Sequence, residues 1–258
     1  MAPFLAYEDK GAQNSAALPL VLIHGHPFDR TMWAPQVAAF SPDRRVIVPD
    51  LRGYGASPVV PGVTPLSVFA EDVAALLDEL RVPEFVLGGL SMGGQIAMEC
   101  YRLFPGRIRG LVLADTFPAA ETPAGRRSRA AAADRLLREG MAGYADEVLY
   151  EMVAPYARPE VAAHVRRMMV TAPPEGAAAA LRGRAERPDY RELLTRVAVP
   201  TLVVVGEDDG FTPVGDAEAM HEALPDSVLH VVRGAAHLPN LEQPADFNSA
   251  LSALLTHL

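Results

Sequence analysis

Several features that would set this chain apart from ordinary globular proteins are scarce or absent in its 258 residues. There is one cysteine, Cys100, so no disulfide can form within the chain, and we expect this residue to be a buried, inert thiol. No apolar run is long enough to span a bilayer, and residues 1–8 lack the basic and apolar regions of a secretory signal. These absences predict a cytoplasmic protein with no membrane partner.

Basic residues are also fewer than acidic ones. The 23 lysine and arginine residues are outnumbered by 32 acidic residues, and the net charge of −9 argues against a nucleic-acid partner. Lys10 is the only lysine, a preference that we attribute to the composition of the source genome. No group of histidine, cysteine or acidic residues has the spacing of a zinc or iron site, so we expect neither a metal nor another cofactor.

The chain does have a regular alternation of apolar runs and helical patterns, and its length fits one large domain or one domain with an insertion. Near-continuous apolar runs are typical of parallel strands buried on both faces; they occupy residues 20–24, 45–49, 84–88, 110–114, 201–205 and 228–232. Helical patterns lie between or after them, at residues 66–81, 92–104, 215–224 and 244–257. The alternation predicts an α/β fold with a mostly parallel sheet covered by helices on both faces, and residues 3–8 could add an edge strand.

One segment, residues 117–196, interrupts this alternation. It has no convincing strand, many alanines, and helical runs at 126–139 and 143–153. Its 13 arginines and 11 acidic residues also make it slightly basic in an otherwise acidic chain. We interpret it as a helical cap inserted between two strands of a core formed by residues 1–116 and 197–258.

The most informative motif is Gly-Leu-Ser-Met-Gly at residues 89–93, which follows one predicted strand and precedes a predicted helix. A serine at such a sharp turn is held clear of its neighbours, and the small residues beside it allow strained backbone angles. The positive end of the following helix also points at the turn, where a developing oxyanion would lie. This context predicts that Ser91 is a nucleophile.

A serine nucleophile needs a base and an acid that orients the base. His237 lies in the loop between the last predicted strand and the last helix, and such loops converge with the turn at Ser91 on one edge of a parallel sheet. For the acid we favour Asp209, in the loop after residues 201–205, with Asp115 at another strand end as the alternative. The predicted catalytic residues are therefore Ser91, Asp209 and His237.

Acyl chemistry also needs donors for the oxyanion. We expect one from the backbone N–H of Met92, directly after the nucleophile, and one from the N–H of His26, between a flexible Gly25 and a proline that cannot donate. We expect His24 to be structural and the side chain of His26 to have no catalytic role. Candidate pocket residues are Phe28, Trp33, Phe117 and Met141.

Five motifs in this order resemble those of α/β-hydrolase-fold serine hydrolases with a helical cap, and the resemblance covers nearly the whole chain. They are residues 24–27 (His-Gly-His-Pro), 50–57 (Asp-Leu-Arg-Gly-Tyr-Gly-Ala-Ser), 89–93, 206–213 and 234–244. The resemblance implies the α/β-hydrolase fold, and it also favours Asp209, whereas Asp115 corresponds to a position that some relatives use instead. It further implies that residues 50–57 serve as scaffold, although a glycine-rich loop after a strand can also cradle phosphate.

The fold supports many reactions, so the site residues must decide between them. Relatives that cleave carbon–halogen bonds or epoxides have aspartate where this chain has Ser91, which leaves acyl chemistry. We therefore predict a hydrolase that cleaves a small-molecule carboxylic ester or lactone through an acyl-enzyme. The alternatives are a biosynthetic enzyme of the same fold (cyclisation, carbon–carbon cleavage or decarboxylative ester cleavage), a cofactor-free perhydrolase, or a binding protein that lost catalysis.

The segment 117–196 is expected to select the substrate. Its arginines could steer a substrate carboxylate, but we favour a solvated helix face on which they pair with Asp134 and Glu139; they are Arg126, Arg127, Arg129, Arg135 and Arg138. We expect a monomer or a homodimer.

Overall fold

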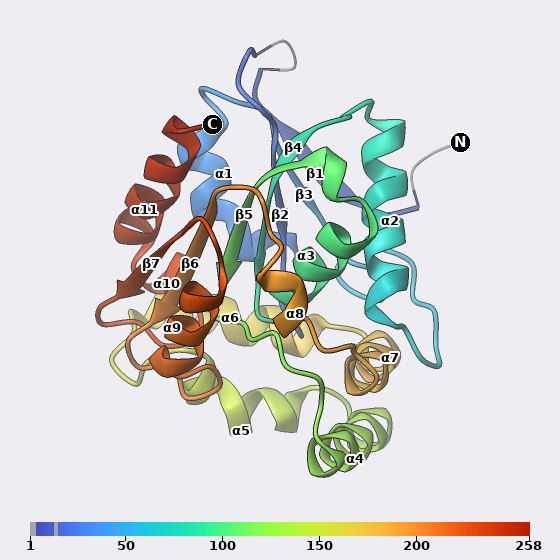
Figure 1. Cartoon of the computed structure of the whole chain (residues 1–258). Coiled ribbons are helices and arrows are strands. Elements are labelled where there is room, and N and C mark those ends of the chain that lie inside the picture. The colour runs from blue at the N-terminus through green and yellow to red at the C-terminus, as the bar shows by residue number, and fades with distance from the viewer. Residues whose placement is uncertain (1–3, 13–14) are drawn as a thin grey trace.

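The computed structural model describes residues 4–12 and 15–258, and its centre is a seven-stranded sheet in the order β1-β3-β2-β4-β5-β6-β7 (Figure 1). The strands are β1 Tyr7–Lys10, β2 Leu20–Ile23, β3 Val46–Pro49, β4 Phe85–Leu90, β5 Ile108–Ala114, β6 Thr201–Gly206 and β7 Ser227–Val232. All neighbouring pairs are parallel except β1 and β3. The six apolar runs are thus confirmed as strands, with ends shifted by at most two residues.

The edge strand begins later than the sequence indicated. The prediction was residues 3–8, of which Pro3 lies outside the described residues, whereas β1 runs antiparallel to β3 from Tyr7. The reason is local: the N–H of Ala6 donates to the Oγ of Ser57, so it is not available for the ladder with β3. The regular ladder with β3 therefore starts at Tyr7.

Helices cover both faces of the sheet. On one face lie α2 (Leu66–Glu79), α3 (Met92–Leu103) and α9 (Val214–Ala223), and on the other α1 (Ala34–Phe40) and α11 (Pro244–Thr256). Shorter elements are η1 (Arg30–Trp33), η2 (Pro105–Arg107) and α10 (Pro239–Glu242). Successive strand residues face opposite sides, so each of the strands β2 to β7 supplies both hydrophobic clusters, as expected for strands covered on both faces.

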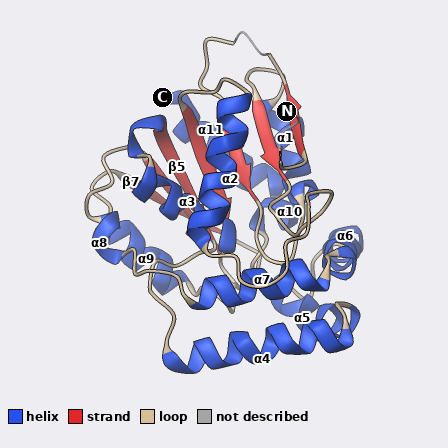
Figure 2. Cartoon of the chain, turned by 90° about the vertical axis from the view of Figure 1, so that its right-hand side faces the viewer, coloured by secondary structure: helices blue, strands red, loops and turns tan. Residues whose placement is uncertain are grey.

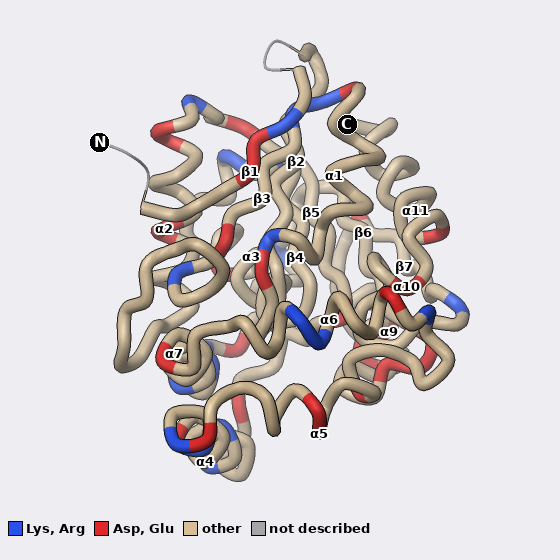
Figure 3. Tube along the Cα trace, turned by 180° about the vertical axis from the view of Figure 1, so that it is seen from behind, with Lys and Arg blue, Asp and Glu red and all other residues tan. Residues whose placement is uncertain are grey.

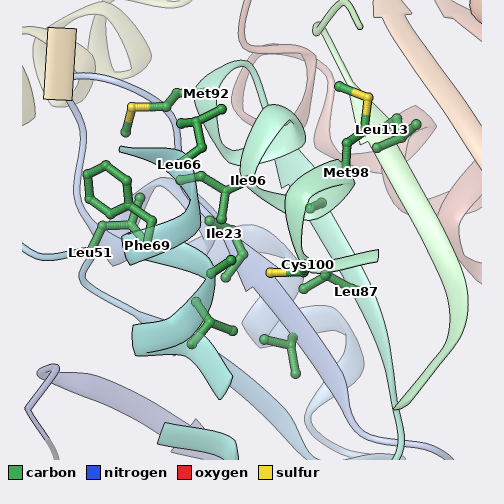
Figure 4. Packing of buried hydrophobic residues seen from close by; sticks show 14 of the residues in the cluster. Ile23, Leu51, Leu66, Phe69, Leu87, Met92, Ile96, Met98, Cys100 and Leu113 are labelled. Atoms are coloured by element: carbon green, nitrogen blue, oxygen red, sulfur yellow. The ribbon is translucent and has the colours of Figure 1, made fainter. Parts of the chain in front are cut away.

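The helix after Ser91 is buried within the first of these clusters. Figure 4 shows Ile96 of α3 beside Leu66 and Phe69 of α2, with Ile23 of β2 below them. Cys100 lies in the same cluster, buried and without a disulfide, as the sequence indicated. Burial raises the pKa of its thiol, which keeps it protonated and unreactive. This packing fixes the helix whose first turn follows the candidate nucleophile.

Residues 117–196 contain helices and no strand. These helices are α4 (Pro123–Glu139), α5 (Ala142–Met152), α6 (Pro159–Thr171), α7 (Pro174–Ala185) and the short α8 (Arg191–Leu194). Figure 2 shows α4 to α7 gathered below the sheet, on the side where the parallel strands end. Among the described residues, no helix is both long and apolar enough to cross a membrane.

Candidate active site

The turn at Ser91 connects β4 directly to α3. Ser91 has φ 57° and ψ −116°, a strained combination for a residue other than glycine that costs about 1–3 kcal/mol. Its N–H donates to the carbonyl of Ala114 (2.9 Å), and its own carbonyl accepts from the Oγ1 of Thr116 (2.8 Å). The end of β5 therefore holds the strained turn in place.

The neighbouring glycines are required by close approach of the backbone. A Cβ at Gly93 would lie 2.1 Å from the carbonyl oxygen of Ile23, and one at Gly89 would lie 2.1 Å from the carbonyl oxygen of Gly93. No side chain can be fitted at these distances, so only glycine allows α3 to start this close to β2 and β4. The sequence motif is thus explained by local sterics.

His237 and Asp209 form a buried hydrogen bond. The Nδ1 of His237 lies 2.8 Å from the Oδ2 of Asp209, and both side chains are almost fully buried. Because a carboxylate can only accept, Nδ1 carries the proton and Nε2 is left as the basic nitrogen. The other oxygen of Asp209 accepts the N–H of Phe211 (2.8 Å), whose ring packs at 5.1 Å against the imidazole.

The charge of Asp209 is favoured despite its burial. Burial alone would raise the pKa of Asp209, but the adjacent His237 and the hydrogen bonds from Thr212 and Phe211 outweigh it and hold the pKa below its ordinary value. Asp209 is therefore ionised at neutral pH, as a group that stabilises a protonated imidazole must be.

Asp115, the alternative acid, makes no hydrogen bond to His237. Its Oδ1 accepts the N–H of Gly206 (2.9 Å), and its Oδ2 is buried without a partner. Burial, together with the negative charge of Asp209, raises the pKa of Asp115 well above its ordinary value, so this carboxyl group is favoured in its neutral form. The two aspartates thus differ in charge although they lie side by side.

These three side chains are also the one group in the described part of the chain that could hold a metal ion, with potential ligand atoms within 4.8 Å of one another. The imidazole and the carboxylate of Asp209 already bind each other, and Asp115 is favoured as a neutral acid, which is a poor ligand. We therefore attribute their proximity to the hydrogen-bonded pair rather than to metal binding.

The loop after β2 contains two buried histidines with different contacts. His24 is buried and its ring links two backbone groups, the carbonyl of Gly25 and the N–H of Leu51, each at 2.9 Å, which confirms the structural role. His26 lies with its Nδ1 2.7 Å from the hydroxyl of Tyr54. The backbone N–H groups of His26 and Met92 have no acceptor within residues 4–12 and 15–258, so both remain available to a ligand.

A single cavity of about 210 Å³ brings these groups together. It is lined by Ser91, His26 and His237 from the loops at the strand ends, and also by Gln95, Asp115, Thr116, Phe117, Arg129, Tyr144, Met152, Leu181, Arg184, Phe211 and Thr212. The cavity is smaller than the 300 Å³ or more of most drug-sized sites, so it suits a small ligand. Of the four predicted pocket residues, only Phe117 lines it.

The other three predicted pocket residues belong to the core. Trp33 is fully buried against Phe247 (ring centroids 5.9 Å apart), and Phe28 packs in the same cluster, on the sheet face opposite α3. Met141, just before α5, packs in the other cluster. The prediction for these three residues is wrong because large apolar side chains near a motif are more often core than pocket.

The arginines of α4 divide into two groups. Arg135 pairs with Glu139 (2.9 Å) on the solvated face, as expected, and also with Glu147 (2.7 Å); Asp134 pairs instead with Arg182 of α7 (2.7 Å). Figure 3 shows the mixed charges along α4 and α7. Arg129 differs from the rest, because it pairs with Glu121 and lines the cavity.

Sequence reasoning missed the polar residues of α3 and α7 that reach the cavity, Gln95 and Arg184. For Arg184, the available signal was its position in the alanine-rich segment of α7, on the same face as residues that must pack against the core. The signal is weak because arginines are common in residues 117–196 and most of them are solvent-exposed or paired with acidic residues.

Comparison with known proteins agrees with this fold. Residues 20–250 match the Alpha/beta hydrolase family. The chain is 33% identical to 3-oxoadipate enol-lactonase 2 of Acinetobacter baylyi over 229 residues, which are 87% of this chain and 84% of the relative. A thermophilic esterase from Thermogutta terrifontis, solved with malate bound, has a TM-score of 0.94 and 42% identity, with 98% of this chain and 93% of that chain aligned. The enol-lactonase from Burkholderia xenovorans has a TM-score of 0.90 and 29% identity over 98% of this chain and 96% of that chain. The chain therefore belongs to the alpha/beta hydrolase family.

Proposed function

We propose that this protein hydrolyses the carboxylic ester bond of a small ester or lactone, with Ser91 as nucleophile, His237 as general base and Asp209 as the acid. The observation that carries the proposal is the buried 2.8 Å hydrogen bond from His237 to Asp209, beside a small cavity that both His237 and the strained Ser91 line. The esterase and enol-lactonase relatives support a hydrolase that acts on ester bonds.

The reaction follows from the proton positions. Nε2 of His237 takes the proton of the Ser91 hydroxyl as its oxygen attacks the carbonyl carbon, and the carboxylate of Asp209 stabilises the imidazolium that results. The backbone N–H groups of His26 and Met92 hold the oxyanion of the tetrahedral intermediate. When this intermediate collapses, the alkoxide leaves with the proton from His237 and the acyl group remains on Ser91.

Deacylation repeats these steps with water. His237 removes a proton from a water molecule, whose oxygen attacks the acyl-enzyme, and the proton then returns to the oxygen of Ser91 as the carboxylic acid leaves. We further propose that residues 117–196 act as a cap over this site, because Arg129, Tyr144 and Arg184 of α4, α5 and α7 line the same cavity as Ser91.

The proposal is tested by labelling and by kinetics. A fluorophosphonate should form an adduct on Ser91, located by mass spectrometry, and Ser91→Ala should lose about 10³–10⁶-fold in kcat on short-chain p-nitrophenyl esters. Ser252→Ala, at an exposed serine of α11, is the matched control and should keep both labelling and turnover. Labelling on a residue other than Ser91, or equal rates for wild type and Ser91→Ala, would contradict the mechanism.

A further inference from the structure

Arg184, near the end of α7, is a buried cation that lines the cavity beside Ser91. Only 7% of it is exposed, and its Nε donates to the Oε1 of Gln95 at 3.1 Å. This is the one side-chain hydrogen bond that Arg184 makes within the described residues, and no carboxylate there lies within ion-pair distance of it. A buried guanidinium group without an acidic partner is uncommon, because taking a charge out of water is costly.

Its charged neighbours increase the imbalance. Arg129 and Arg187 both bind the Oε2 of Glu121, so the two guanidinium groups whose charges act on Arg184 already share one carboxylate. Burial and the positive charges of Arg129 and Arg187 lower the pKa of Arg184 well below its ordinary value. A guanidinium group remains protonated in proteins, so the lowered pKa means that acidic groups compensate little of the positive charge of Arg184.

A second unpartnered donor lies beside Arg184. Gln95 of α3 is fully buried and lines the cavity, and its Nε2 has no hydrogen-bond partner. The orientation of this amide is fixed by chemistry: Arg184 can only donate, so the amide oxygen must face it and the NH₂ group must face away. Buried polar groups in folded proteins normally have partners, so this unpaired donor is available to a ligand.

The two features together describe a site for a carboxylate. Carboxylate oxygens accept charge-assisted hydrogen bonds from guanidinium groups and further bonds from amide NH₂ groups. Gln95 lies one helical turn after Ser91 and its N–H donates to the Ser91 carbonyl, so the site begins one turn from the nucleophile. Within a cavity of about 210 Å³, both the anion and the reacting carbonyl must belong to one short molecule.

We propose that the substrate carries a free carboxylate that binds to Arg184 and to the Nε2 of Gln95, with Arg129 adding positive charge nearby. The proposal rests on the ester hydrolysis proposed above and specifies the class of substrate: small carboxylate-bearing esters or lactones. Arg184 is then a specificity-determining residue, and the uncompensated charge of the free protein is neutralised when substrate binds.

The test compares carboxylate esters with neutral isosteres. Monomethyl glutarate and methyl 5-methylhexanoate differ only in a carboxylate or an isopropyl group on the acyl side, and acetoxyacetate and isobutyl acetate differ in the same way on the alcohol side. We expect wild type to have at least a tenfold higher kcat/KM on the carboxylate of one pair. Unactivated esters are chosen because a free carboxylate accelerates the spontaneous breakdown of nitrophenyl esters.

The variants then assign the preference to a residue. Arg184→Met should lower the ratio of the two kcat/KM values by about 10- to 100-fold, the range for loss of a charge-assisted hydrogen bond, and Arg184→Lys should lower it less. Arg182→Met, two residues away on α7 at an arginine paired with Asp134 outside the cavity, should keep the wild-type ratio. Thermal unfolding of each variant establishes that it is folded.

The outcomes separate the two proposals. Activity on neither member of any pair, with no fluorophosphonate label on Ser91, would overturn both ester hydrolysis and the carboxylate site. Equal or better turnover of the neutral isosteres in both pairs would overturn the carboxylate site alone. A wild-type preference for carboxylates that survives Arg184→Met would also overturn it, because the anion would then bind to other residues.

Discussion

The cavity beside Ser91 has two walls of different origin. One consists of loops at the carboxyl ends of the strands, where Ser91 and His237 lie, and the other of helices from residues 117–196, which supply Arg129 and Arg184. The first wall is built from short backbone turns that glycine and hydrogen bonds fix locally. The second is positioned by long-range contacts of its helices, such as the hydrogen bond from the N–H of Thr64 to the carbonyl of Ala179 in α7 (3.0 Å). The difference teaches that the proposed reacting groups are encoded by local motifs, whereas the proposed binding groups depend on tertiary packing.

The loops at the strand ends carry Asp115 and Asp209, and substitutions there should have the largest effect on catalysis. Asp209→Asn should lower kcat by about 10³–10⁴-fold, because an amide cannot stabilise the imidazolium and favours the wrong tautomer of His237. Asp115→Asn should change kcat by less than about tenfold, because the burial that raises the pKa of Asp115 already favours its neutral form. Steady-state kinetics on one ester measures both. A larger loss for Asp115→Asn than for Asp209→Asn would transfer the role of the acid to Asp115.

Glycine substitutions compare the rigidity of the two walls. Gly93→Ala should lower the free energy of unfolding by about 3 kcal/mol, since the added methyl group would meet the carbonyl of Ile23 at 2.1 Å. Gly143→Ala, in α5, has open space around it and should raise stability by about 0.5 kcal/mol through helix propensity. Urea denaturation provides both values. Equal effects at the two positions would show that the turn at Ser91 is less constrained than its contacts indicate.

The same contrast explains which parts of the molecule could be predicted from the sequence. Strands were recognisable because parallel strands buried on both faces read as unbroken apolar runs, and the acid loop because Asp209 follows one of them. Gln95 and Arg184 were harder to recognise, because an arginine in an alanine-rich helix is a weak signal and their contact depends on the approach of α7 to α3. Trp33 and Phe28 were misplaced for the related reason that an apolar side chain carries no sign of whether it lines a cavity.

The free energy of unfolding should depend on pH in opposite directions for Asp115 and for Glu121. Burial raises the pKa of Asp115, so its contribution to stability is present below its unfolded value of about 4 and is lost as the pH rises toward the folded value. Burial would also raise the pKa of Glu121, but hydrogen bonds from Arg129 and Arg187 outweigh it and lower this pKa to about 2. The contribution of Glu121 is therefore present above pH 4.5 and is lost as the pH falls toward 2.

Two isosteric variants make these signs measurable. Asp115→Asn should be more stable than wild type at pH 7, and this difference should vanish near pH 4. Glu121→Gln should be less stable than wild type at pH 7 by roughly 1 kcal/mol, a value that allows for solvent screening of the ion pairs, and this difference should shrink between pH 4.5 and 2. Denaturation midpoints at several pH values provide the comparison. Differences that do not vary with pH would contradict the assigned ionisation states.

The smallest expected effect on stability concerns Arg184, in the wall formed by residues 117–196. Arg184→Met should change the free energy of unfolding by less than about 1 kcal/mol, because two contributions oppose each other. Removing a buried, uncompensated cation stabilises the fold, whereas the Oε1 of Gln95 loses its donor at a cost of about 1 kcal/mol. Arg187→Met should instead lose about 2 kcal/mol, because the carbonyls of Ala119 and Arg184 lose their donor and Glu121 keeps only Arg129. Urea denaturation at neutral pH distinguishes the two. If Arg184→Met were as destabilising as Arg187→Met, Arg184 would be a structural residue of the helices in residues 117–196. A residue retained for binding should instead show nearly unchanged stability together with lost carboxylate selectivity.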